Sequence, residues 1–167
     1  NYTRLMNTLK LNKTNKQTGF TIIEVVLVLA IAGLIFLMVF IALPALQRSQ
    51  RDSQRKNDLG RVLTAVQNYQ SNNRGAIPDG SWSETLDSYL NKTAGEFKDP
   101  DGSNYVFRSI PAGDPITEFK NGVGNTLIAV HYYGKCGEAG SSVSASGRQM
   151  VALSIMLESG GVYCVNN

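Results

Sequence analysis

One uninterrupted apolar segment constrains this chain more than any other feature of its sequence. Residues 25–43 contain no charged side chain and are almost entirely apolar. As a helix with a rise of 1.5 Å per residue, they would extend for about 28 Å, close to the thickness of a bilayer's hydrocarbon core. The segment therefore predicts a membrane-spanning helix.

Two alternatives to a membrane span fit the segment less well. A cleaved secretory signal has a shorter apolar region followed by a small-residue cleavage site, and the sequence ALPALQ that follows here is a poor one. A core helix of a soluble protein normally has a polar face, but nothing polar interrupts residues 25–43 on any side.

Three residues in or beside the segment have special consequences. Glu24 directly precedes it, and a carboxylate in lipid is costly unless it has a partner. Gly33 lies within the segment and weakens the helix there. Pro44 directly follows the segment, where it removes an intrahelical hydrogen bond and kinks or locally melts the helix.

The basic character of the chain belongs to its N-terminus. The formal net charge is +3, but four of the 16 basic residues precede Gly19 and none of the 13 acidic residues does. Residues 20–167 therefore carry 12 basic and 13 acidic side chains, a net charge of −1. A basic isoelectric point is thus no argument for nucleic-acid binding. Basic residues on both sides of the apolar segment also leave its orientation undecided by charge; those after it are Arg48, Arg51, Arg55, Lys56 and Arg61.

The helix is expected to continue beyond Pro44 to about Asn73. Leu59, Val62 and Val66 recur at helical spacing and, with Leu63 and Tyr69, form one apolar stripe. Before Leu59 the sequence is polar on every side, which predicts a helix that is solvated or packed against like helices of complementary charge. From Phe20 to Asn73 such a helix would be about 80 Å long.

The remaining sequence, residues 74–167, predicts a globular head. Its first segment, SWSETLDSYLNK, reads as a short helix with a capping box formed by Ser81 and Glu84. Strands are expected near residues 105–110, in NTLIAVHYY, in RQMVALSIMLES and in VYCVNN, with a hairpin turn at Gly160-Gly161. The small, polar segment GEAGSSVSASG is expected to be an exposed loop. The predicted fold class is α+β: a long N-terminal helix packed on a small antiparallel sheet of about four strands.

The chain contains two cysteines, Cys136 and Cys164, both in its C-terminal third. In an exported protein they would form one disulfide that closes a loop of about 29 residues and contributes roughly 3–4 kcal/mol in the chain-entropy model. Two separate buried thiols are the alternative. Zinc binding is disfavoured because His131 is the only histidine to accompany them.

The sequence GFTIIE, residues 19–24, lies between the basic leader and the apolar segment. This arrangement resembles the N-terminus of type IV prepilins, specifically over residues 16–43 and in architecture through Tyr69. In that family a membrane peptidase cleaves after the glycine on the cytoplasmic side and methylates the new N-terminal residue. The resemblance implies that Gly19 ends the leader and that Phe20 is the first, N-methylated residue of the mature subunit.

The resemblance also implies a role for Glu24. In the family, the corresponding carboxylate neutralises the N-terminal amine of a neighbouring or the same subunit during assembly. Because a charge in lipid is costly alone and tolerated when paired, this pairing favours the transfer of subunits from bilayer to filament. Gly33 and Pro44 fall where pilin filaments have a melted stretch of this helix.

The resemblance divides the chain into four parts: a prepilin leader peptide at residues 1–19, a transmembrane and assembly helix at 20–44, its amphipathic continuation at 45–73 and a globular head at 74–167. It places the leader in the cytoplasm and the head outside. That location supports an oxidised Cys136–Cys164 pair, which would hold the last strand as the C-terminal disulfide loop does in many pilins.

Several weaker signals in the sequence have plain structural explanations. Asp99, Asp101 and Asn104 in DPDGSN offer oxygen ligands of the kind that calcium uses, as in some pilins and pseudopilins, but a β-turn explains them more simply. His131 on a predicted strand is expected to be a partly buried spacer. No catalytic Ser/His/Asp arrangement or phosphate-binding glycine loop is present. The basic cluster at residues 48–61 is not expected to bind DNA, because acidic residues within it reduce its positive charge.

These observations predict a non-enzymatic type IV pilin subunit without a required cofactor. It would be a single-pass membrane protein before assembly and part of a cell-surface filament afterwards, serving adhesion, twitching motility or DNA uptake. Its expected partners are copies of itself, the prepilin peptidase and the inner-membrane assembly platform, with a host surface or DNA as further candidates. The alternatives are a pseudopilin or minor pilin of a type II secretion or competence system, and an anchored binding domain that never polymerises.

Overall fold

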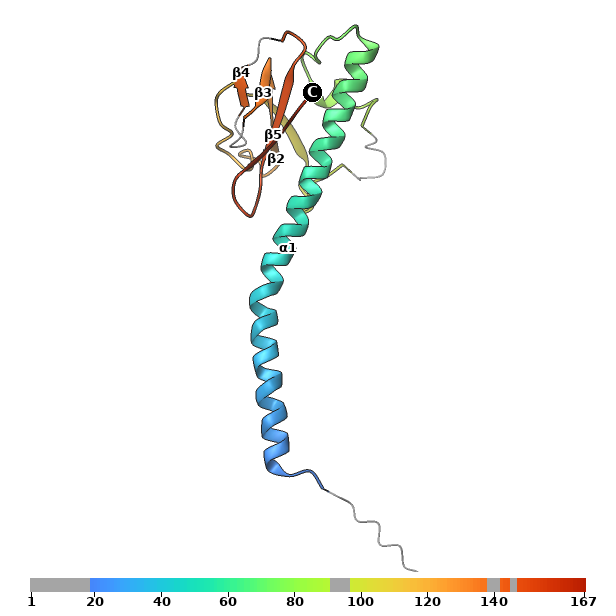
Figure 1. Cartoon of the computed structure of the whole chain (residues 1–167). Helices are drawn as coiled ribbons and strands as arrows, with labels where there is room; N and C mark the ends of the chain where they lie inside the picture. The colour runs from blue at the N-terminus through green and yellow to red at the C-terminus, as the bar shows by residue number, and fades with distance from the viewer. Residues whose placement is uncertain (1–18, 91–96, 138–141, 145–146) are drawn as a thin grey trace, which may run out of the picture. The chain divides into compact units, whose positions relative to one another are not determined.

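The computed structural model describes residues 19–90, 97–137, 142–144 and 147–167. The chain divides between Ile41 and Ala42 into two compact units. Helix α1 (Ile22–Asn72) has residues in both units, and the sheet belongs to the C-terminal one (Figure 1). Apart from Gly19, the predicted leader lies outside the described residues.

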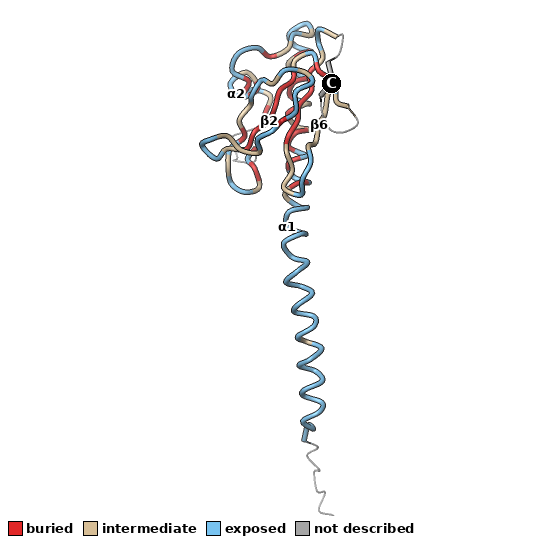
Figure 2. The backbone as a smooth tube through the Cα atoms, turned by 90° about the vertical axis from the view of Figure 1, so that its left-hand side faces the viewer, coloured by how far each residue is buried: buried red, intermediate tan, exposed pale blue. Residues whose placement is uncertain are grey.

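In the N-terminal unit, α1 exposes its apolar side chains. Phe36, Phe40 and Ile41 have exposed fractions of 64%, 73% and 72%, and Figure 2 shows this part of α1 in the colour of exposed residues. Because exposing apolar surface to water costs roughly 25 cal/mol per Å², such a helix requires a nonaqueous environment or a partner. Among the described residues, α1 is the one helix with the length and composition to cross a membrane.

In the C-terminal unit, one face of α1 is buried against the sheet. Leu59, Val62 and Val66 are fully buried, and Leu63 and Tyr69 pack against the same core. The predicted apolar stripe of the helix is therefore confirmed.

The buried face of α1 continues towards the N-terminus through charged residues. Asp52, Arg55 and Asp58 lie at three-residue spacing and are almost completely buried. The expectation that the helix before Leu59 is solvated or packed against like helices is therefore wrong for these side chains, because the protein's own head covers them. Helical spacing had placed them on the same side as Leu59 and Val62.

Four strands form the main sheet, in the order β1-β2-β5-β6. They are β1 (Tyr105–Ser109), β2 (Thr126–Tyr132), β5 (Val151–Met156) and β6 (Val162–Asn166). β2 and β5 lie side by side in Figure 1. Together with α1, this sheet confirms the predicted α+β class of a long helix on a small four-stranded sheet.

The sheet differs from the prediction in one pairing. β2 and β5 are antiparallel, as are β5 and β6, but β1 and β2 are parallel, so the sheet is mixed. Parallel neighbours require a crossover of about a dozen residues or more. Residues 110–125 provide it, and Ile116 within them packs on Leu127 and Ala129 of β2. The sequence pattern predicted each strand of the main sheet, but it did not predict that β1 and β2 run parallel.

The turn between β5 and β6 has the predicted glycines. Gly160 and Gly161 have φ values of 96° and 85°, a region that non-glycine residues rarely adopt. The amide of Leu157 donates a hydrogen bond of 3.1 Å to the carbonyl of Gly161, which closes the hairpin.

The helix predicted in SWSETLDSYLNK is shorter than expected. α2 comprises only Trp82–Thr85, and the Ser81 side chain at its N-cap makes no capping hydrogen bond, so the predicted capping box is absent. Trp82 of this helix, and Leu86 and Leu90 after it, belong to the core. Residues 91–96 lie outside the described residues.

Two further short strands form a separate ladder. β3 (Gly134–Cys136) pairs antiparallel with β4 (Ser142–Ser144). β4 falls inside the segment predicted as a loop, so that prediction is wrong at these three residues. The neighbouring positions 138–141 and 145–146 lie outside the described residues.

The main core lies between α1 and the facing side of the sheet, and buried residues gather there in Figure 2. Alternate residues of β2 and β5 point into this core, as the period of two along a strand requires. On the other side of the sheet, Leu127 and Ala129 pack with Ile116. β2 is therefore buried on both faces. The principal core residues from the sheet are Ile128, Val130, Val151, Leu153 and Ile155.

Candidate functional site

The predicted processing junction lies immediately before α1. Gly19 and Phe20 are outside the helix and exposed, and the Phe20 side chain has an exposed fraction of 88%. Among the described residues, and apart from the chain neighbours of Gly19, no atom would lie within 4 Å of a Cβ atom added at Gly19. A peptide bond in this position is sterically accessible to another protein.

A reciprocal capping box fixes the start of α1. The Thr21 amide and hydroxyl both donate hydrogen bonds of 2.9 Å to Oε2 of Glu24, and the Glu24 amide donates one of 3.4 Å to the Thr21 hydroxyl. This is the arrangement of a Ser/Thr N-cap with Glu three residues later. The sequence analysis missed it, although TIIE contains the required spacing.

The capping box gives the Glu24 carboxylate polar partners beside an apolar helix. Both hydrogen bonds end on the same oxygen, Oε2. Glu24 also lines an exposed apolar hollow together with Phe20, Val25 and Val28. The carboxylate therefore lies on the helix surface, next to the residue that would carry a new N-terminal amine after cleavage at Gly19.

Gly33 and Pro44 both lie within the helix. α1 is continuous through the two positions, and Pro44 is an internal helix residue. Proline has no amide hydrogen, so it leaves the carbonyl four residues earlier without its usual intrahelical bond. Melting of this region in a filament remains a prediction.

Arg55 is the centre of a buried ion cluster. Its Nε and Nη2 each donate a hydrogen bond of 2.6 Å to Asp99, in a bidentate arrangement. Nη2 also donates to Glu158 at 2.7 Å, and Nη1 to Asp52 at 3.1 Å. The guanidinium carbon lies 4.9 Å from the ring centroid of Phe119.

The Asp52 carboxylate also binds the backbone of the β5–β6 turn. It accepts hydrogen bonds from the amides of Glu158 and Ser159 at 2.8 and 2.9 Å. Arg51 forms an ion pair with Glu158 at 2.6 Å. The cluster thereby connects α1 to two segments of the head that are distant in sequence.

The contacts within the cluster favour the ionised forms of Asp52, Glu158 and Arg55. Burial alone would raise the pKa of Asp52, but hydrogen bonds from Ser159, Glu158 and Arg55 outweigh it and lower the pKa. The hydrogen bond from Arg51 lowers the pKa of Glu158, with a further contribution from Arg55. Burial would lower the pKa of Arg55, but the hydrogen bonds to Asp99 and Glu158 raise it.

Asp58 extends this polar region by one turn of α1. Its carboxylate accepts a hydrogen bond of 2.9 Å from the hydroxyl of Tyr105 and forms an ion pair of 3.4 Å with Arg61. Burial raises the pKa of Asp58, and burial together with the Asp58 charge raises that of Tyr105. In the basic cluster considered for DNA contact, Arg51, Arg55 and Arg61 therefore already form ion pairs with carboxylates of the protein.

Two of the three residues considered for calcium form ion pairs within the protein itself. Asp99 is paired with Arg55, and Asp101 with Lys120 at 2.6 Å. Burial would raise the pKa of Asp101, but hydrogen bonds from Lys120 and Ser103 lower it. Asn104 uses its backbone carbonyl to accept from the Thr126 amide. Within the described residues no group of three or more His, Cys, Asp or Glu side chains could hold a metal ion, and calcium binding remains untested.

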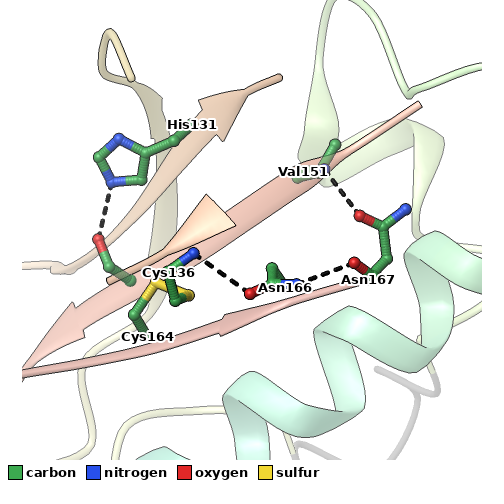
Figure 3. The surroundings of a disulfide bond; sticks show 7 residues. His131, Cys136, Val151, Cys164, Asn166 and Asn167 are labelled. Atoms are coloured by element: carbon green, nitrogen blue, oxygen red, sulfur yellow. Dashed lines mark hydrogen bonds between the residues drawn. A yellow bond between two sulfur atoms is a disulfide. The ribbon is translucent and has the colours of Figure 1, made fainter. Parts of the chain in front are cut away.

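The disulfide predicted between Cys136 and Cys164 is present, with a Cα–Cα distance of 5.8 Å. It connects β3 to β6, and Figure 3 shows the polar contacts around it. The Cys136 amide donates to the Asn166 side chain at 3.2 Å, and the Val151 amide donates to that of Asn167 at 2.8 Å. The C-terminal strand is thereby fixed by both a covalent bond and side-chain amides.

His131 is more deeply buried than predicted. Its exposed fraction is 1%, and its ring lies 2.9 Å from the Ser154 hydroxyl and 3.3 Å from the Pro111 carbonyl. Burial lowers the pKa of His131. The residue therefore connects β2 to β5 and to the crossover rather than binding a ligand at the surface.

Comparison with known proteins gives one match. A family model described as the prokaryotic N-terminal methylation motif matches residues 14–40. The searches of curated proteins and of solved structures returned no match. The motif, together with the apolar helix that follows it, suggests a structural protein with a membrane-anchored precursor.

The motif and the fold agree with the resemblance drawn from GFTIIE. The matched range contains the Gly19–Phe20 junction, the capping box and most of the exposed apolar part of α1. The chain therefore contains a prokaryotic N-terminal methylation motif, the motif found in type IV pilin precursors, followed by a long helix packed on a four-stranded mixed sheet, an α+β architecture consistent with a pilin-like fold.

Proposed function

We propose that this chain is the precursor of a type IV pilin subunit. The prepilin peptidase would cleave between Gly19 and Phe20 and methylate Phe20, and the mature subunit would polymerise through α1 into a cell-surface filament. The methylation motif at residues 14–40 carries this proposal. The accessible Gly19–Phe20 junction and the exposed apolar helix that follows it are in keeping with it.

Glu24 would have two successive partners. In the precursor, the Thr21 amide and hydroxyl bind its carboxylate and reduce the cost of placing it at the membrane. After cleavage, the new amine of Phe20 on the same or a neighbouring subunit would pair with it. The capping box thus explains how the carboxylate is tolerated before assembly, and the ion pair explains why assembly is favoured.

Two matched variants separate these roles. Glu24→Gln removes the charge but keeps the capping box, because glutamine can take the place of glutamate at the third helical position of this motif. Thr21→Val removes the capping hydroxyl and keeps the carboxylate. We expect the Glu24→Gln chain to be processed but not assembled, and the Thr21→Val chain to retain most of its assembly.

The measurement is the amount of subunit in filaments sheared from cells, compared with the processed subunit in membranes. Normal filament yield from the Glu24→Gln variant would contradict the proposed ion pair. If the native chain is processed but is recovered only from the cell envelope, a pseudopilin would be favoured.

A further inference from the structure

The two edges of the main sheet are protected to different degrees. At one edge, the disulfide Cys136–Cys164 connects β6 to β3. At the other edge, β1 pairs only with β2 among the described strands. An unpaired edge presents a row of amide and carbonyl groups to which another strand can bind.

The register shows which groups of β1 point outward. The Thr126 amide donates to the carbonyl of Asn104 at 2.9 Å, and the Ile110 amide donates to Val130 at 3.0 Å. Successive residues of a strand direct their backbone groups to opposite sides, so the even-numbered residues face β2. Phe107 and Ser109 therefore direct theirs away from β2, and the described residues provide no hydrogen-bond partner for them.

A pocket lies beside these outward groups. It has a volume of about 340 Å³ and is lined by side chains that include Trp82, Phe107 and Tyr132. The Trp82 ring centroid is 6.0 Å from that of Phe107 and 6.0 Å from that of Tyr132. Trp82 Nε1 donates a hydrogen bond of 2.6 Å to the Tyr132 hydroxyl, which fixes the aromatic wall. The pocket has room for one large apolar side chain.

Two exposed acidic residues are adjacent in sequence to residues that line the pocket. Asp79 directly precedes Gly80 and Glu84 directly follows Ser83, and both of these neighbours line it. No described residue forms an ion pair with Asp79 or Glu84. Basic groups on an incoming partner would therefore find complementary charge on this side of the edge.

We propose that β1 binds an extended peptide segment of another protein by strand addition. The partner's backbone would pair with Phe107 and Ser109, one apolar side chain would enter the pocket, and flanking Lys or Arg residues would approach Asp79 and Glu84. Main-chain pairing supplies affinity in this binding mode, and the pocket supplies specificity. The proposal does not rest on the filament function.

A peptide fits this site better than a carbohydrate. Sugar binding would require an exposed aromatic face, but Trp82 has an exposed fraction of only 5%. The open backbone groups at strand spacing favour a main-chain partner.

The test uses the full chain in detergent micelles and fluorescent pentapeptides of the form Lys-Val-X-Val-Lys. X is Leu, Ile, Phe, Tyr or Trp, and X shares one face of the strand with both lysines. Fluorescence anisotropy measures the affinity. The best peptide is then N-methylated either at X or at both valines, because only one of these sets of amides faces β1 in a strand. We expect one of the two methylated peptides to lose binding and the other to keep it.

Variants of Ser109 provide the matched control. Ser109→Pro removes the outward amide, whereas Ser109→Ala keeps it. We expect Ser109→Pro to weaken binding by about threefold to tenfold, the equivalent of one backbone hydrogen bond, and Ser109→Ala to leave it unchanged. Glu84→Lys, at an exposed position of α2, should also weaken binding, most strongly at low salt.

Three results would overturn the proposal. The first is the absence of saturable binding by every peptide of the panel at 1 mM, on the order of the weakest affinity expected of such a site. The second is equal loss of binding by both N-methylated peptides. The third is equal affinity of the Ser109→Pro and Ser109→Ala chains for the best peptide, together with no effect of Glu84→Lys.

Discussion

Replacement of Arg55 by methionine should strongly destabilise the head. The guanidinium is completely buried and binds Asp99 through two hydrogen bonds, with further bonds to Glu158 and Asp52. Methionine fills similar space without charge. The substitution therefore leaves the carboxylates of the cluster without their common cation while it changes the packing little.

The expected loss follows from this burial. Removal of one partner from a buried ion pair costs about 3–5 kcal/mol, because the remaining charge is desolvated and uncompensated. In a domain of this size, 1 kcal/mol corresponds to a change of about 2–6 °C in Tm. We therefore expect Tm of the head to fall by roughly 10–20 °C.

The assay can follow the head selectively. Trp82 is the chain's single tryptophan and lies in the core, so its fluorescence reports unfolding of the head in detergent micelles. Arg48→Met is the matched control because Arg48 is exposed on the same helix; it should change the unfolding free energy by no more than about 0.5 kcal/mol. A loss below about 1 kcal/mol for Arg55→Met would refute the assigned role of the cluster.

Three further predictions concern the disulfide, acid stability and processing. Reduction of Cys136–Cys164 should lower the unfolding free energy of the head by about 3–4 kcal/mol, measured by urea denaturation with and without reductant. The pKa values of Asp52 and Glu158 in the folded head lie below their ordinary values of 3.8 and 4.5. The two carboxylates therefore contribute their full stabilisation above about pH 4.5 and lose it as the pH falls through their pKa values in the folded head. Gly19→Trp should block cleavage, seen as a leader-bearing mass, although no described residue beyond its chain neighbours crowds this position.

Each of these predictions has a contrary outcome. An unchanged denaturation midpoint under reductant would show that the disulfide does not stabilise the head. Asp58, whose pKa is raised by burial, opposes the acid effect, so stability that stays constant or rises from pH 5 to pH 3 would mean that Asp52 and Glu158 are not the dominant groups. Normal cleavage of the Gly19→Trp chain would move the processing site away from Gly19.

The periodic elements of the fold could be predicted from the sequence. Leu59, Val62 and Val66 follow the helical period, and the strands at β2 and β5 are rich in apolar and β-branched residues, so local pattern and tertiary packing agree. The direction of β1 could not be predicted, because it depends on the route of residues 110–125 rather than on the pattern within the strand.

The charged contacts could be predicted less well for a physical reason. From the sequence alone, Asp52 and Arg55 are expected to be exposed to solvent. Their burial is favourable only because Asp99 and Glu158, which are distant in sequence, supply charged and hydrogen-bonding partners. Their three-residue spacing, in line with the apolar stripe, was the available signal. The N-terminal motif depends on local sequence, so GFTIIE sufficed to predict it, and the methylation-motif model matches residues 14–40.

The central claim is that the chain is processed at Gly19–Phe20 and leaves the membrane as part of a filament. It is tested most directly by the intact mass and N-terminal sequence of the protein in material sheared from cell surfaces. The account predicts a species that begins at N-methylated Phe20. A chain that retains its leader, or one found only in the membrane fraction, would contradict it.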